Sequence, residues 1–262
     1  VLQGGTPAGS GSWHEGGCAW QPLDAVGSER ASSVGARFVI RLGDLKNLIS
    51  GMKEQLKQGR RTPHEGAGIR SYHDTFLLYT WLLQSLCTSL RPTSRPNALY
   101  AAWNDASDLC SPVWAGLADK DNRYFEKARP IRLVPLLETQ FEHYRQHFKA
   151  VRSRLGLSQR LKAEANDNLP LFVIAHGNQI EPLRPAWLED QLHRRFAPLP
   201  ANFHRAFLRT ELLERDCSPE AVDAFMGHAN LGESPYARHT TFDYRLFWSC
   251  IENALLSLHH EL

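Results

Sequence analysis

An arginine, a histidine and a tyrosine stand in a fixed order near the C-terminus of this chain. His228 comes 23 residues after Arg205, and Tyr236 comes eight residues after His228. Arginine suits phosphate because its planar fork offers parallel N–H donors and stays protonated. A tyrosine hydroxyl can act as a nucleophile when a cationic site activates it, since its ordinary pKa is near 10. The order therefore indicates chemistry on a phosphodiester.

Two short helices are predicted to position Arg205 and His228. The second helix begins at Ser218-Pro219, a capping residue followed by proline at the first helical position. Such a pair of helices can hold two polar side chains over one site. The first helix is predicted to direct four apolar side chains inward, those of Phe207, Leu208, Leu212 and Leu213.

The segment from Asn202 to Tyr236 resembles the C-terminal half of the catalytic domain of tyrosine recombinases, the phage integrase family. In that family a helix with an H-x-x-R element leads through LLE, and then through a helix ending in GH, to a nucleophilic tyrosine. The matching motifs in this sequence are Leu212-Leu213-Glu214, Met226-Gly227-His228 and Tyr236. The resemblance extends over residues 38–262 and is strongest from 202 to 236.

Two features differ from the family pattern. Asn202 occupies the position of the first histidine of H-x-x-R, and a histidine stands instead at His204. Adjacent helical residues point about 100° apart, so His204 cannot replace residue 202 without a change in geometry. The tyrosine also follows His228 one residue earlier than in the family. We therefore expect a reduced or reassigned base function at His204.

The resemblance implies two further catalytic residues upstream. Arg91, in Thr88-Ser89-Leu90-Arg91, follows an apolar helix as the first catalytic arginine follows TGLR in the family, with serine in place of glycine. Lys120 matches a lysine in the turn between two strands, whose role would be to protonate the leaving 5′ oxygen; Lys127 on the same loop is the rival. A helix-end arginine can also simply satisfy terminal carbonyls, and a lysine in a polar turn is usually solvated.

The resemblance also implies roles for the downstream residues. Arg205 would bind the phosphate, His228 would hydrogen-bond a nonbridging oxygen, and Tyr236 would be the nucleophile. Arg209 lies in a poorer register relative to His228 than Arg205 does, and Tyr244 is the second choice of nucleophile. A histidine at a helix end can equally be a capping residue.

Composition restricts the class of protein. With 262 residues and 42% hydrophobic content, the chain can form one domain of about 200 residues with a tail. The net charge of +2 does not by itself indicate nucleic-acid binding. Five scattered cysteines without a C-x-x-C pair favour a reduced, cytoplasmic setting. No apolar run is long enough to span a bilayer, so no membrane association is expected.

Periodicity predicts a mainly α fold with a small antiparallel β-sheet (α+β), and the resemblance implies the fold of the recombinase catalytic domain. Residues 1–37 are expected to be a flexible lead-in or the remnant of an upstream module, and the domain is expected to occupy 38–262. The first helix is expected from a cap at Asp44 to a stop at Gly59. The other expected elements are a helix over 72–87, a hairpin within 111–135, a helix over 139–155, a strand over 171–175, and helices over 187–196 and 245–262.

The combined expectation is a site-specific DNA recombinase or integrase. It would cleave and rejoin double-stranded DNA through a 3′-phosphotyrosine intermediate, without metal or cofactor, and would be nucleoid-associated. The family resemblance also implies a homo-oligomer on DNA, assembled through the apolar stripe of the C-terminal helix. Two alternatives remain: a recombinase-like DNA-binding protein without cleavage activity, and an unrelated helical interaction domain.

Overall fold

The computed structural model describes residues 40–61, 67–91, 114–117, 129–151, 172–176, 179–196, 198–228 and 243–262. The expected lead-in over 1–37 lies outside this part of the chain. Within it, the protein is mainly helical and carries two small antiparallel sheets. The α+β expectation is therefore confirmed at this level.

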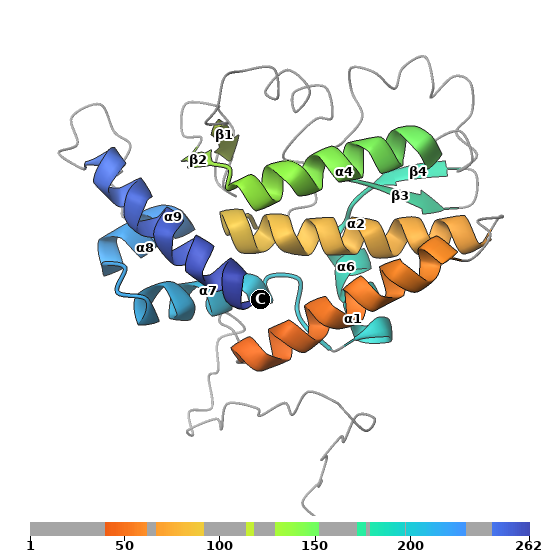
Figure 1. Cartoon of the computed structure of the whole chain (residues 1–262), viewed down its shortest axis with the longest axis horizontal. Helices are drawn as coiled ribbons and strands as arrows, with labels where there is room; N and C mark the ends of the chain where they lie inside the picture. Colours follow the sequence, from red (N-terminus) through yellow and green to blue (C-terminus); the bar gives the residue numbers. More distant parts are fainter. Residues whose placement is uncertain are drawn as a thin grey trace, which may run out of the picture.

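Helix α2 (Ala67–Thr88) runs through the middle of the molecule, between α1 (Leu42–Arg61) on one side and α4 (Pro135–Val151) on the other (Figure 1). A helix that is apolar on most sides must be covered on most sides. The central position predicted from its composition is thus confirmed. Its fully buried apolar residues are Leu77, Leu78, Leu82 and Leu86.

The limits predicted for α1 are wrong at both ends. The helix begins at Leu42, so Asp44 lies in its first turn, where it accepts a hydrogen bond from the Arg41 backbone N–H (3.4 Å). It also continues past Gly59 to Arg61. A Cβ at position 59 would lie 2.6 Å from a ring carbon of Tyr72 on α2. Gly59 therefore permits close packing of two helices rather than ending one.

Two hairpins supply the strands. The predicted one is confirmed: β1 (Trp114–Leu117) pairs antiparallel with β2 (Arg129–Arg132). The strand expected over 171–175 is β3 (Val173–His176), and its antiparallel partner β4 (Gln179–Pro182) was not predicted. Helix α4 begins four residues earlier than expected because Pro135 suits a first helical position.

Three helices surround the C-terminal end of α2: α7 (Phe203–Glu214), α8 (Pro219–Met226) and α9 (Tyr244–Glu261) (Figure 1). Helix α6 (Pro185–Arg195) precedes them. The predicted cap of α8 is confirmed, since the Ser218 side chain accepts a hydrogen bond from the Ala221 N–H (3.2 Å). The inward direction predicted for Leu213 is wrong: this side chain is 38% exposed, whereas Phe207, Leu208 and Leu212 are buried.

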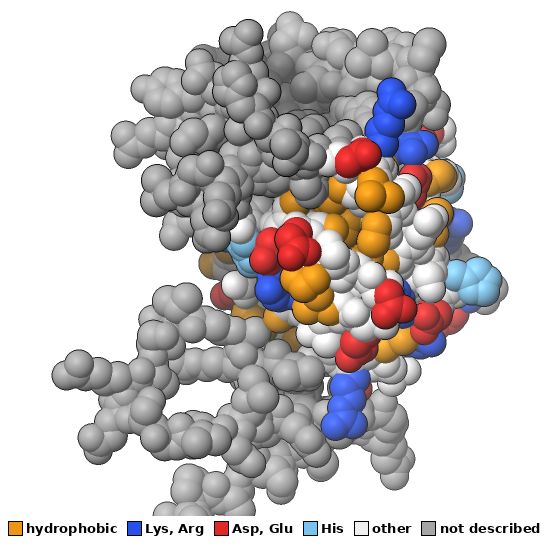
Figure 2. Space-filling model, turned by 90° about the vertical axis from the view of Figure 1, so that its left-hand side faces the viewer, with side chains coloured by type: hydrophobic (Ala, Val, Ile, Leu, Met, Phe, Trp, Pro, Cys, Tyr) orange, Lys and Arg blue, Asp and Glu red, His pale blue; other side chains and the backbone are white. Residues whose placement is uncertain are grey.

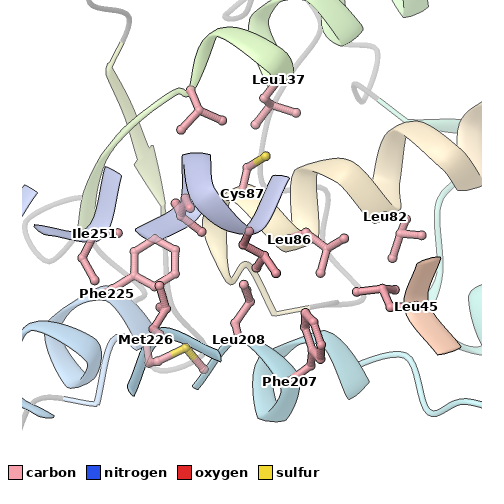
Figure 3. Close-up of a cluster of buried hydrophobic side chains, with 14 of the residues drawn as sticks. Leu45, Leu82, Leu86, Cys87, Leu137, Phe207, Leu208, Phe225, Met226 and Ile251 are labelled. Carbon is pink, nitrogen blue, oxygen red and sulfur yellow. The ribbon is translucent and has the colours of Figure 1, made fainter. Parts of the chain in front are cut away.

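The apolar stripe of α9 is buried against the protein's own core. Figure 3 shows Ile251 of α9 beside Phe225 of α8, in one buried cluster with side chains from α2 and α7. Two ion pairs hold the helix, Arg132–Glu252 (2.9 Å) and Arg215–Glu261 (2.7 Å). The stripe that was expected to contact a neighbouring protomer is therefore used within one chain. None of the described helices combines the length and apolar character needed to cross a membrane.

Candidate functional site

Arg91 and Arg205 lie in the wall of one open pocket of about 450 Å³. Arg91 follows the end of α2, and Arg205 lies in the first turn of α7. Two arginines far apart in sequence thus line the same pocket. The other lining residues are Pro185 and Glu189 of α6, together with Ala201 and Asn202 before α7.

Arg205 connects the ends of two helices. Its side chain is buried, and its guanidinium donates to the carbonyls of Ser89 (2.5 Å) and Met226 (2.6 Å). Ser89 follows α2 and Met226 ends α8, so both carbonyls belong to helix termini that lack helical partners. A third bond goes from Nη2 to Nε2 of His228 (3.0 Å). Most of the hydrogen-bonding capacity of Arg205 is therefore used within the protein.

Ser89 has a left-handed backbone conformation (φ 53°) just after α2. Glycine is favoured in this region because it has no Cβ. Ser89 is held instead by a hydrogen bond from its hydroxyl to the Phe225 carbonyl (2.9 Å). The turn brings Arg91 to the pocket.

His204 lies in the core and does not line the pocket. It is fully buried, its Nε2 hydrogen-bonds the Leu90 carbonyl (2.8 Å), and its ring meets Trp81 edge-to-face. Burial lowers the pKa of His204 to about 4, against which the bond to Leu90 acts only in part. The arrangement makes His204 a structural residue and gives no support to a base role. Asn202 lines the pocket in its place.

His228 follows the left-handed Gly227 (φ 68°) that ends α8. Its backbone N–H donates to the Asp223 carbonyl (2.9 Å), which completes the cap. The side chain is 40% exposed. Partial burial lowers the pKa of His228, Arg205 and other nearby arginines lower it further, and Asp223 raises it. His228 is therefore neutral near pH 7 in the free protein.

Other predicted site residues cannot be placed with these three. Lys120, its rival Lys127 and the nucleophile candidate Tyr236 lie outside the described residues, as does the side chain of Tyr244. The arrangement brings together Arg91, Arg205 and His228.

Two carboxylates near the site were not predicted. Glu189 lines the pocket and accepts a hydrogen bond from the Ala201 N–H (3.0 Å). Asp223 forms an ion pair with Arg209 beside His228. No local pattern marks Glu189, because its contacts come from a different element. Asp223, in contrast, lies about one helical turn before the GH pair, so its proximity to His228 could have been inferred from helical spacing.

Comparisons of the chain with protein-family models, with curated proteins and with solved structures gave no match. The resemblance to tyrosine recombinases therefore stays a prediction. It depends on the motif residues of the sequence.

Proposed function

We propose that this chain is a DNA strand transferase of the tyrosine recombinase type, with a recombinase-like catalytic domain. The observation that supports the proposal most is the meeting of Arg91 and Arg205 in one pocket, with His228 bonded to Arg205. Two arginines at one pocket suit an anion with several oxygens, such as a phosphodiester.

In the proposed reaction the Tyr236 oxygen attacks phosphorus, an O–P bond forms, and the bond from phosphorus to the 5′ oxygen breaks. Arg91 and Arg205 stabilise the added charge, and each such donor can lower the barrier by roughly 2 to 4 kcal/mol. Lys120 protonates the leaving 5′ oxygen. The product is a 3′-phosphotyrosine link, which the 5′ hydroxyl of a partner strand can attack in reverse. The reaction needs no metal or other cofactor.

A recombinase-like protein that binds DNA without cutting it is the second candidate. It is favoured by Asn202, which lines the pocket and can donate a hydrogen bond to phosphate but cannot take up a proton. The burial of His204 favours it too. Arg205 would then be explained by its bonds to the ends of α2 and α8.

A pool of nicked duplexes with randomised sequence distinguishes the two candidates. A strand transferase should leave a protein–DNA adduct that survives denaturation. The nick lets the short fragment that carries the free 5′ hydroxyl diffuse away, so that this hydroxyl cannot reverse the reaction. Tyr236→Phe should abolish the adduct and leave DNA binding almost unchanged, since it removes one oxygen. Tyr244→Phe is the matched control and should retain the adduct.

Each other outcome has a defined meaning. An adduct with Tyr236→Phe but not with Tyr244→Phe would identify Tyr244 as the nucleophile. Salt-dependent DNA binding without any adduct would favour the non-cleaving candidate. If the protein neither binds DNA nor forms an adduct, the alternative that is left is an unrelated helical interaction domain.

The proposal includes double-stranded DNA as partner, assembly on it as a homo-oligomer through α9, and association with the nucleoid. The described part of the face in Figure 2 carries acidic, basic and apolar side chains intermixed, so it offers no single broad basic surface. Leu246 near the start of α9 is 69% exposed and is available for a contact between protomers.

A further inference from the structure

Four polar side chains form a row from the surface of α7 to the wall of the pocket. Arg209 pairs with Asp223 of α8, and the same carboxylate oxygen lies 3.9 Å from Nδ1 of His228. Nε2 of His228 then meets Nη2 of Arg205 at 3.0 Å. Arg205 lines the pocket, so the row connects a surface ion pair with the candidate phosphate site.

The row determines which nitrogen of His228 carries the proton. A guanidinium can only donate, so Nε2 of His228 must accept and hold a lone pair. The proton of the neutral ring is then on Nδ1, which faces the Asp223 carboxylate. At 3.9 Å this contact is electrostatic rather than a hydrogen bond. It still favours the N–H on that side of the ring.

Charged groups surround His228 on three elements. Arg205 and Arg209 face it from α7, Arg91 from the end of α2, and Asp223 from α8. Partial burial lowers the pKa of His228 most, the three arginines lower it further, and Asp223 is the acidic group that raises it. An anion bound in the pocket would supply a second negative charge and would favour the imidazolium form.

We infer that Asp223, held by Arg209, is a positioning residue that fixes the Nδ1–H tautomer of His228 and leaves Nε2 as the proton acceptor of the site. The inference rests on the proposed function, because that reaction releases a proton from the attacking tyrosine. The Arg205 N–H first leaves the single lone pair of Nε2 that it occupies. The proton then moves from the tyrosine hydroxyl to Nε2 as the O–P bond forms. The imidazolium can no longer accept from Arg205, so Nε2–H and one N–H of Arg205 both become available to the phosphate oxygens.

Nitrogen NMR of the histidine side chains tests the tautomer directly. In the folded wild-type protein, His228 should show a protonated Nδ1 and an unprotonated Nε2. Asp223→Asn should lower the pH at the midpoint of the His228 titration, whereas Arg209→Gln should raise it, each by about half a pH unit. Asp190→Asn, which breaks an exposed pair with Arg194 on α6, is the matched control and should leave the midpoint unchanged.

The inference is overturned if wild-type His228 carries its proton on Nε2. It is also overturned if Asp223→Asn and Arg209→Gln move the midpoint in the same direction, or do not move it. The wild-type spectrum alone tests the tautomer, so an unfolded variant does not prevent a decision.

Sulfate tests the coupling between anion and proton, because it does not titrate between about pH 5 and 8. Calorimetry in buffers of different ionisation enthalpy should show proton uptake on sulfate binding to the wild type. In Asp223→Asn the uptake should appear at lower pH than in Asp190→Asn. Sulfate binding without proton uptake in the wild type would contradict the inference.

The covalent assay separates this inference from the proposed function. If the NMR and sulfate results are as expected and no adduct forms on nicked DNA, the proposed function fails while the positioning of His228 by Asp223 stands. If the adduct forms with the same pH profile in wild type and Asp223→Asn, the inference fails while the function stands.

Discussion

Consecutive residues of α7 hold the chain that carries Arg91. Arg205 binds the carbonyl of Ser89, and His204 binds the carbonyl of Leu90, directly before Arg91. The position of one pocket arginine therefore depends on the helix that carries the other. This arrangement gives His204 a defined structural task.

His204 should make the protein less stable in mild acid. Its pKa is near 4 in the fold and 6.5 as a reference, so the unfolded chain binds the proton more readily. The contribution of His204 to the free energy of unfolding is fully present above about pH 6.5. It decreases as the pH falls and does not change further below about pH 4. Urea unfolding should show the wild type losing about 2 kcal/mol more than His204→Gln between pH 7 and pH 5. His143→Gln, at an exposed position of α4, should behave like the wild type; an equal loss in His204→Gln would disprove the assignment.

Substitutions at Ser89 should separate the cost of its backbone conformation from the value of its hydrogen bond. Ser89→Ala keeps the left-handed strain and loses the bond to Phe225, so it should lower the free energy of unfolding by about 1 to 3 kcal/mol. Ser89→Gly loses the same bond but relieves the strain, and should be more stable than the alanine variant by about 1 kcal/mol. Denaturant unfolding of both variants is the measurement. Equal stabilities would mean that the turn relaxes when the side chain is changed.

Helix α2 is the element on which the others depend. Helices α1, α4 and α7 and strand β3 all contact it. Its C-terminal end supplies the turn that leads to Arg91, while α8 supplies the second carbonyl bound by Arg205. Packing on α2 thus determines the geometry of the pocket.

The α1–α2 contact should be sensitive to one methyl group. Gly59→Ala places a Cβ 2.6 Å from the Tyr72 ring, so one helix must move and stability should fall by about 1 to 3 kcal/mol. Gly43→Ala on the same helix is the matched control, because its Cβ would meet nothing within 4 Å. Its stability should be unchanged or rise by up to about 1 kcal/mol through better helix propensity. Thermal unfolding compares the two, and equal effects would contradict the close contact.

At the scale of the whole molecule, α9 closes the main core. Ile251, Leu255 and Leu258 are fully buried in the cluster that also contains residues of α1, α2, α7 and α8. Ion pairs connect the helix to β2 and to the end of α7. The folded domain therefore depends on this last segment.

Deletion of the residues after Asp243 should abolish cooperative unfolding, because it exposes the core face that α9 covers. A truncated chain that still unfolds cooperatively would show that α9 is dispensable for the fold. Leu246→Gln tests an intermolecular role separately: at this exposed site stability should change by less than about 0.5 kcal/mol. If the protein assembles on DNA through α9, the Leu246→Gln variant should show weaker assembly in sedimentation measurements with DNA.

Local patterns in the sequence were enough to predict the central helix α2, the cap at Ser218 and the hairpin of β1 and β2. Such features arise from the backbone preferences and the apolar periodicity of neighbouring residues, and both can be recognised in the local sequence. Contacts between distant residues decided the rest. Gly59 resembles a helix stop until Tyr72 is placed against it, and Leu213 belongs to an apolar pattern but is 38% exposed in the fold.

The same division applies to the candidate site. The order of Arg205 and His228 was visible in the sequence, and so was the analogy of Arg91 with a catalytic arginine. Only the tertiary structure decided that His204 is buried on the Leu90 carbonyl and that Arg205 binds the ends of two helices. The physical reason is that burial and hydrogen-bond partners depend on which elements meet, and no residue type carries that information by itself.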